Sequence, residues 1–189
     1  MRKACRPSGA VIAFEPIDAI ADVLQKNVER NCLQQVTVVR AGLSDRHATK
    51  VPIYASCGQA PRGDDNCGLG SLYGETTGDT LVQFIDVTTL DDYLAQSPVP
   101  KVDLIKVDIE GTELPFLRGA EQTLRTHRPF LIIEVQDMST AAAGYAASDI
   151  LDYLYGLGYR FERIGRKGKL TSLTPSELSE IQNVLCTPA

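Results

Sequence analysis

The sequence predicts an α/β fold, namely a doubly wound and mainly parallel sheet in a single domain over residues 1–189, with an antiparallel C-terminal edge. Short apolar runs alternate with segments of helical spacing, as they do in βαβ units. The run Phe130–Val135 is almost uninterrupted, which is typical of a strand whose sheet carries helices on both faces. A hydrophobic content of 43% in 189 residues is enough for one core.

The composition narrows the partners and the compartment. With a net charge of −5 and a pI near 5.1, the chain offers no basic field to nucleic acid, so we expect a small-molecule partner. Five scattered cysteines without a CxxC pair and two distant histidines predict reduced thiols and no metal site built from cysteine or histidine. No apolar run reaches the roughly 18 residues of a membrane span, and no signal peptide is recognisable. We therefore expect a soluble, cytoplasmic protein without a membrane partner.

The first half of the chain alternates strand and helix and then continues with strands. Apolar runs, helical spacing and turn residues set the boundaries. In order, we predict strands Val11–Phe14 and Val36–Val39 around a helix Asp18–Asn31, a turn at Gly42–Asp45, and strands Val51–Ala55 and Leu81–Val87 around a long polar loop, Cys57–Thr80.

The second half repeats the alternation and ends in strands. Leu117, Ala120 and Leu124 share one helical face and should point inward. We predict a short helix through Leu94 capped by Thr89, a strand Val102–Val107, a helix from Gly111 to Arg128-Pro129, a strand Phe130–Val135, a helix Ser148–Gly156, and strands Tyr159–Arg163 and Val184–Cys186.

Polar residues directly after apolar strands mark the candidate site. In open parallel sheets, ligands bind beyond the carboxyl ends of the strands, so these residues should gather along one rim. Six residues meet that test: Glu15, Ser44, Asp45, Asp108, Glu110 and Glu134.

Two of these positions suit an adenosine. The carboxylate of Glu15, at a strand tip, can accept both ribose hydroxyls, although a strand-end carboxylate also often serves the start of the next helix. Ser44-Asp45 could bond an adenine amine, or could bond locally within a turn.

The segment Ile105–Gly111 predicts an acidic pocket floor. Asp108 and Glu110 follow a buried strand, and Gly111 allows close backbone approach, so these carboxylates could orient a hydroxyl, accept its proton or bind a divalent cation. The alternative is a pair of acids that complement a helix dipole. Glu134 within an apolar strand either faces the same crevice or pairs with Lys106.

These residues, in this order, resemble the FkbM family of methyltransferases. The matching stretches are VIAFEP, VTVVRAGLSD, TLDDYL, VDLIKVDIEG with TELPFLRGA, RPFLIIEV and NVLCTP. They run from about Val11 to Pro188 and form a long ordered match.

The resemblance implies a Rossmann-like class I methyltransferase fold, S-adenosylmethionine as methyl donor, and a hydroxyl on a sugar, polyketide or other small molecule as acceptor. Glu15 would then bind the ribose, Asp45 would lie by the adenine, and Asp108 would lie beside the methyl-transfer zone. We expect Asp108 to act as the base, with Glu110 and Glu134 as helpers or metal ligands.

The sequence departs from the family at its start. Such proteins begin with an apolar strand and a glycine-rich turn that approaches the cofactor, and neither precedes Val11. The missing strand would lie between the Val11 and Val102 strands. Its loss would cost about 6 to 12 kcal/mol if it buried four large apolar side chains, against a net stability of about 5 to 15 kcal/mol for a domain.

Three arrangements follow from that departure: a fragment of a longer enzyme, a sheet closed by re-paired strands, or a homodimer that shares a strand. We expect weak or absent S-adenosylmethionine binding by this chain. Two other functions stay open, a non-catalytic binding or assembly module and a nicotinamide-dependent oxidoreductase, although the latter lacks a GxGxxG motif.

Overall fold

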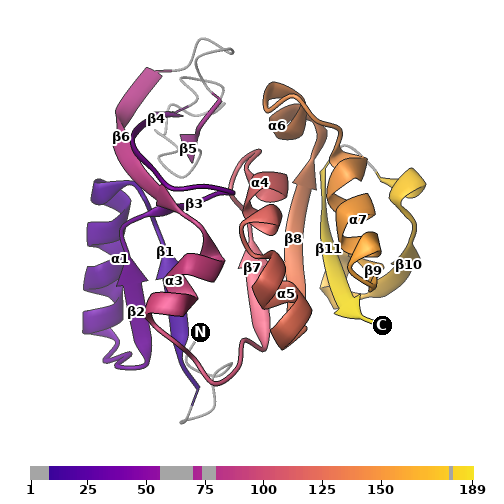
Figure 1. The fold of residues 1–189 in the computed structure, drawn as a ribbon, viewed down its shortest axis with the longest axis horizontal. Helices are drawn as coiled ribbons and strands as arrows, with labels where there is room; N and C mark the ends of the chain where they lie inside the picture. Colours follow the sequence, from indigo (N-terminus) through magenta and orange to yellow (C-terminus); the bar gives the residue numbers. More distant parts are fainter. Residues whose placement is uncertain (1–8, 56–69, 74–79, 179–180) are drawn as a thin grey trace.

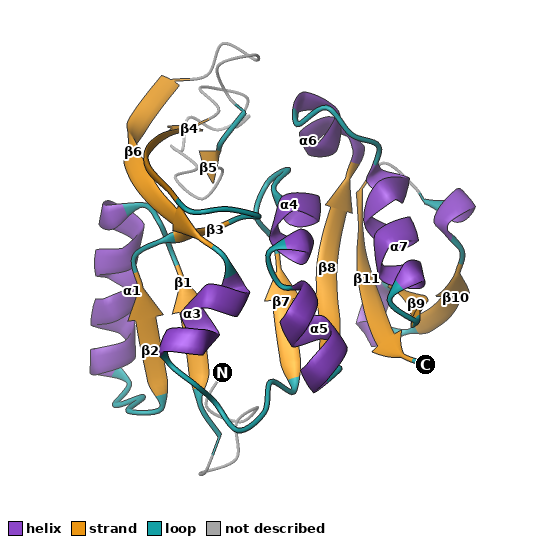
Figure 2. Ribbon diagram, in the orientation of Figure 1, coloured by secondary structure: helices purple, strands orange, loops and turns teal. Residues whose placement is uncertain are grey.

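A computed structural model describes residues 9–55, 70–73, 80–178 and 181–189, and its strands form three sheets (Figures 1 and 2). The first is a parallel pair of β1 (Val11–Phe14) and β2 (Val36–Val39). The second has five strands in the order β10 (Leu170–Leu173), β9 (Tyr159–Ile164), β11 (Ile181–Pro188), β8 (Phe130–Gln136) and β7 (Leu104–Val107). The third has the order β3 (Gly42–Leu43), β6 (Thr80–Thr88), β4 (Ala48–Ala55) and β5 (Gly70–Ser71).

Helices α4, α5 and α7 lie on one face of the five-stranded sheet (Figure 1). Thr89 begins α3 as predicted, because its hydroxyl accepts a hydrogen bond from the Asp92 N–H at 3.0 Å. The described helices are α1 (Asp18–Arg30), α3 (Leu90–Gln96), α4 (Glu113–Arg118), α5 (Glu121–His127), α6 (Asp137–Ala142) and α7 (Ala147–Gly156), with 3-10 turns at Arg166–Gly168 and Pro175–Glu177. None of them has the length and apolar character that a membrane crossing requires.

The prediction of one mainly parallel, doubly wound sheet is only partly confirmed. The fold is α/β, but among the described strands three pairs are parallel and five are antiparallel. β4 and β6 pair in antiparallel fashion, and β11 runs antiparallel between β8 and β9. The predicted antiparallel C-terminal edge is confirmed by β9, β10 and β11.

Several element boundaries also differ from the prediction. The turn at Gly42–Asp45 contains the short strand β3, and α6 and β10 were not predicted. The predicted loop at Cys57–Thr80 lies mostly outside the described residues. The part of it that the structure describes contains the short strand β5.

The single helix predicted from Gly111 is two helices, because the chain breaks at Gly119 and Ala120. A side-chain carbon at Gly119 would lie 2.0 Å from the backbone oxygen of Ser44, so the segment after β3 fills the space that a side chain would need. The inward face was predicted correctly, since Leu117, Ala120 and Leu124 are fully buried in the main core beneath α4, α5 and α7.

No strand joins β1 to β7 in the part of the chain that the structure describes. Helix α3 instead contacts both the β1–β2 pair and the helices that cover the five-stranded sheet. Phe14 of β1 packs edge-on against Tyr93 with ring centroids 4.9 Å apart. On the other side of α3, the Asp91 carboxylate accepts hydrogen bonds from the backbone N–H groups of Gln122 and Thr123 in α5, at 2.9 and 2.8 Å. Helix α3 therefore ties the two sheets together.

We predict that Gly119→Ala destabilises the protein by about 1 to 3 kcal/mol or more, because the new methyl group would collide with a backbone atom that cannot rotate away. Urea denaturation measures the change. Gly156→Ala is the matched control, because no heavy atom lies within 4 Å of the added carbon. Equal unfolding midpoints for the two variants would contradict this packing.

Candidate active site

The carboxyl ends of the parallel strands meet at one edge of the molecule. β2, β7 and β8 point the same way in Figure 1, and β1 is parallel to β2. Glu15 follows β1 directly, and Asp108 follows β7 directly, so the structure places both residues at this edge. The sequence-predicted acids at these two strand ends therefore lie on the same side of the fold.

Asp108 and Glu134 are neighbours because of the strand register. β7 and β8 pair in parallel with Val107 opposite Ile133, so the next position of each strand carries a carboxylate. Glu110 joins them, and one carboxylate oxygen from each of the three residues lies within 4.8 Å of the others. The structure thus brings together three of the predicted residues, and carboxylate oxygens so close together can share a proton or hold a cation.

Like charges and partial burial act on this acidic cluster of Asp108, Glu110 and Glu134. Burial and the neighbouring Asp108 and Glu110 carboxylates raise the pKa of Glu134, against a hydrogen bond from Asn183. Burial also raises the pKa of Glu110, while a hydrogen bond from the Ser139 hydroxyl lowers it. A carboxylate with a raised pKa is better able to carry a proton near neutral pH.

Lys106 pairs with Asp108 and not with Glu134. The Lys106 Nζ lies 2.6 Å from Asp108 Oδ2 in a largely exposed ion pair. The predicted alternative of a Lys106–Glu134 pair is therefore wrong, because neighbouring residues on one face of β7 lie two positions apart, which places Lys106 beside Asp108.

The turn that carries the cluster has an unusual backbone. Glu110 and Gly111 are consecutive residues with positive φ, +50° and +95°. A non-glycine residue in this region costs on the order of 1 to 2 kcal/mol and persists only where the surroundings fix it. A side-chain carbon at Gly111 would also lie 2.6 Å from the backbone oxygen of Ser139 in α6, so glycine is required there.

Glu15 is half-buried, and its two oxygens differ. Oε1 accepts a hydrogen bond from the Ile17 N–H at 2.9 Å, just before α1 begins, and the other oxygen accepts none within the described ranges. Burial raises the pKa of Glu15, and the bond from Ile17 opposes this. One oxygen thus serves the helix start, as the local interpretation expected, and the second accepts no hydrogen bond from the described residues.

Ser44 and Asp45 follow β3 and not β2, so their position differs from the predicted one. Ser44 is buried, its N–H donates to the Thr88 carbonyl at 2.9 Å, and its hydroxyl lies 3.3 Å from the Asp45 carboxylate. This favours local bonding for Ser44. Asp45 stays exposed, with Arg46 at 3.4 Å.

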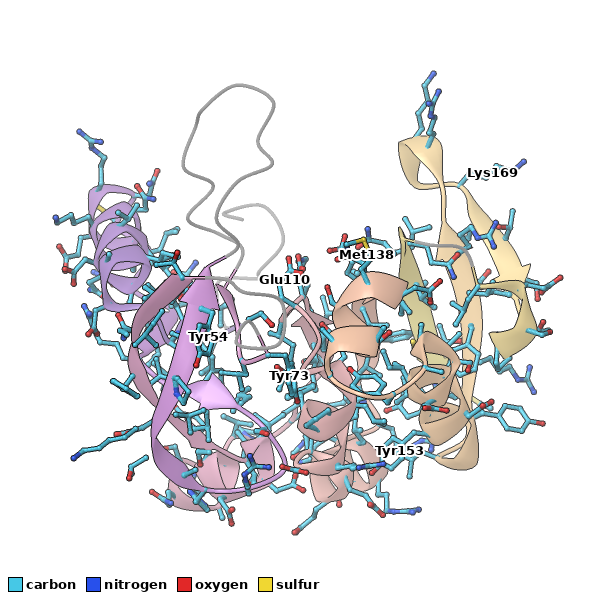
Figure 3. The ribbon with its side chains drawn as sticks, turned by 90° about the horizontal axis from the view of Figure 1, so that it is seen from above. Tyr54, Tyr73, Glu110, Met138, Tyr153 and Lys169 are labelled. Carbon is cyan, nitrogen blue, oxygen red and sulfur yellow. The ribbon has the colours of Figure 1, made fainter. Side chains whose placement is uncertain are left out.

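Figure 3 looks down on this edge of the molecule. Glu110 and Tyr73 lie in the middle of the view, with Tyr54 of β4 on one side and Met138 of α6 on the other. Burial raises the pKa of Tyr73, with Arg46 lowering it and Asp45 and Glu113 raising it further. Tyr73 therefore lies close enough to Asp45 and to Glu113 for both charges to affect its pKa.

Sequence reasoning missed two residues beneath the cluster, Glu113 and Tyr145. Glu113 is only 4% exposed, and it contacts the strained turn together with the Tyr145 hydroxyl. The available signal was the position of Glu113 directly before the apolar run Leu114–Leu117, which forms the buried face of α4. Nothing in the local sequence of Tyr145 marks its role.

Comparison with known proteins defines the family. Residues 1–161 match the model of the methyltransferase FkbM domain. The chain therefore belongs to the FkbM methyltransferase family, as the sequence motifs predicted.

Relatives and a solved structure agree with that assignment. "Methyltransferase 1" of Beauveria bassiana is 32% identical over 129 residues, which covers 61% of this chain and 50% of the relative. "Methyltransferase sdnD" of Sordaria araneosa is 27% identical over 142 residues, covering 61% and 53%. The crystal structure of methyltransferase FkbM from Methylobacillus flagellatus KT shares the fold with a TM-score of 0.52 at 20% identity, over 94% of this chain and 36% of that one. The chain spans about half the length of these two curated relatives.

We predict that Glu134→Gln gains stability relative to the natural protein as pH rises from about 4 to 7. Because the folded-state pKa of Glu134 is raised above 4.5, the protonated form favours folding at low pH, and that contribution is lost as pH rises through the folded pKa. Glutamine keeps the uncharged shape at every pH.

Urea unfolding at several pH values measures the difference between the two proteins. Glu29→Gln, which removes an exposed carboxylate from α1, is the control for the chemistry of the substitution. A stability difference for Glu134→Gln that is independent of pH would contradict the prediction.

Proposed function

We propose that this domain transfers the methyl group of S-adenosylmethionine to a hydroxyl oxygen of a sugar, polyketide or other small molecule. The observation that carries the proposal is the placement of Glu15 and the acidic cluster at one strand edge of a chain from a methyltransferase family. A carboxylate that accepts ribose hydroxyls and a second carboxylate that accepts a proton are two of the groups that this reaction uses.

The hydrogen-bond acceptors at this edge suit the adenosine half of the cofactor. The Glu15 oxygen without a partner among the described residues can accept a ribose hydroxyl, and the exposed Asp45 carboxylate can accept from the adenine amine. The Ser44 hydroxyl donates a hydrogen bond to the Asp45 carboxylate at 3.3 Å and so helps to orient it. Bound S-adenosylmethionine would supply an electrophilic methyl group on its sulfonium.

The acidic cluster would then handle the acceptor proton. The bound donor would methylate the acceptor oxygen and leave as its neutral thioether, and Asp108 would accept the hydroxyl proton. Lys106 holds the Asp108 carboxylate in place through its 2.6 Å contact. Glu110 and Glu134, whose pKa values are raised by burial, orient the acceptor by hydrogen bonding. Positioning of the two reactants supplies much of the acceleration.

We predict weak binding of S-adenosylmethionine by the 189-residue chain. The described residues include acceptors for adenosine but no strand with a glycine-rich turn between β1 and β7, so backbone contacts to the methionine half are lacking in the described ranges. Isothermal titration calorimetry measures this. An affinity of about 1 µM, or about −8 kcal/mol, would contradict the prediction.

We predict that Asp108→Asn lowers methyl transfer by about 100-fold or more, because an amide cannot accept the hydroxyl proton. The assay follows label from the donor, at saturating concentration, into a panel of hydroxylated small molecules. Asp103→Asn is the matched control. Asp103 also forms an ion pair with the lysine two residues before it, Lys101, at 3.0 Å, but it lies at the other end of β7, away from the acidic cluster.

Transfer that survives in Asp108→Asn would remove Asp108 as the base. Absence of transfer to every acceptor at saturating donor would favour the non-catalytic module. Reduction of a nicotinamide by the chain would identify the oxidoreductase.

A further inference from the structure

We propose that Glu113 is a positioning residue whose buried carboxylate holds the Asp108–Gly111 turn in the shape that presents Asp108 and Glu110 at the strand edge. Glu113 begins α4 and is 4% exposed, so it acts from beneath the turn and not on the acceptor. The consequence for methyl transfer rests on the proposed function, whereas the effect on the turn does not.

Both oxygens of the Glu113 carboxylate accept hydrogen bonds from the turn. The Gly111 N–H lies 3.0 Å from Oε2 and 3.3 Å from Oε1, and the Ile109 N–H lies 3.2 Å from Oε1. Gly111 is buried, so its N–H would have no solvent partner without this carboxylate. Hydrogen bonds to an ionised acceptor are stronger than those between neutral groups.

The Tyr145 hydroxyl completes the support from the other side. It lies 2.9 Å from the Gly111 carbonyl oxygen and 3.3 Å from Glu113 Oε2, and its single proton is donated to one of them at a time. The Leu114 N–H in turn lies 3.4 Å from the hydroxyl oxygen. Gly111 is therefore held through both its N–H and its carbonyl group.

The turn needs this support because two successive residues, Glu110 and Gly111, have positive φ. Such a backbone persists only where its surroundings over-determine it. The Ser71 hydroxyl, which donates to the Glu110 carbonyl at 3.2 Å, adds a third contact. Together these bonds fix the direction in which the Glu110 side chain leaves the turn.

A buried acid is a costly means of stabilisation, which argues for a role beyond stability. Burial raises the pKa of Glu113, and hydrogen bonds from its own N–H, Gly111, Ile109 and Tyr145 only oppose this. In other proteins, apolar groups can replace buried ion pairs with little loss or even a gain of stability. The burial of Glu113 is explained if its carboxylate is needed to hold the turn in this shape.

Amide hydrogen exchange in the full 189-residue chain, followed by NMR, tests the proposal without requiring activity. In Glu113→Gln and in Tyr145→Phe, we expect exchange at Ile109 or Gly111 to accelerate by about three- to tenfold for each weakened hydrogen bond, while Leu131 and Ile133 in β8 keep their rates. Unchanged exchange in the turn, or equal acceleration throughout the core, would overturn it. If Glu113→Gln does not fold, Tyr145→Phe decides the outcome.

Two variants control for the chemistry of the substitutions. Tyr159→Phe removes another buried tyrosine hydroxyl, which lies 3.5 Å from the Leu124 carbonyl oxygen. Glu121→Gln changes a surface carboxylate that also accepts from a tyrosine hydroxyl, that of Tyr153 at 2.9 Å. Both should leave exchange in the turn at its natural rate, and acceleration there would overturn the specificity of the effect.

Methyl-transfer kinetics separate positioning from general stability. With an acceptor found active, we expect Glu113→Gln to lower kcat about tenfold with KM for the donor within about twofold, because the turn and not the adenosine site is disturbed. An unchanged kcat would overturn the positioning role. If the natural chain transfers no methyl group, the proposed function fails, and amide exchange alone still decides the role of Glu113 in the turn.

Discussion

The parallel register of β7 and β8 is the constraint on which the candidate site depends, because it carries Asp108 and Glu134 to adjacent positions past the last paired residues. Two carboxylates so placed repel each other, and the edge supplies compensation from separate elements. Lys106 of β7 pairs with Asp108, and Asn183 of β11 donates to Glu134 at 3.4 Å. Glu134 therefore gains its hydrogen bond from Asn183 only when β11 has entered the sheet between β8 and β9.

The strands that were predictable are those whose signal is local. Val11–Phe14 and Val36–Val39 have the predicted bounds because each is a compact apolar run ended by a breaker. The arrangement of strands was less predictable, because β11 pairs with β8 at a distance of about fifty residues along the chain. The break between α4 and α5 was also hidden, since the Ser44 backbone that occupies the space at Gly119 comes from a remote segment.

The same distinction applies to the site. Asp108, Glu110 and Glu134 could be placed together from sequence because a polar residue after an apolar strand has few other locations in such a fold. Glu113 could not, because an acid in the first turn of a helix is ordinarily exposed, and its burial here depends on packing against Tyr145, which follows α6. The family resemblance supplied a chemistry for the edge, whereas the support beneath it became visible only in the folded structure.

The relative position of Glu15 and Asp108 is set by helix packing and not by sheet hydrogen bonds. β1 and β7 do not pair in the described ranges, so α3 is one of the links between Glu15 and the acidic cluster, through Tyr93 against Phe14 and through Asp91 at the start of α5. Side-chain packing tolerates small shifts that a hydrogen-bonded ladder does not. A strand bound between β1 and β7 would add two rows of backbone hydrogen bonds to the contacts made through α3. The distance between the two carboxylate sites, and with it the affinity for a ligand that spans them, would then be fixed by the sheet itself.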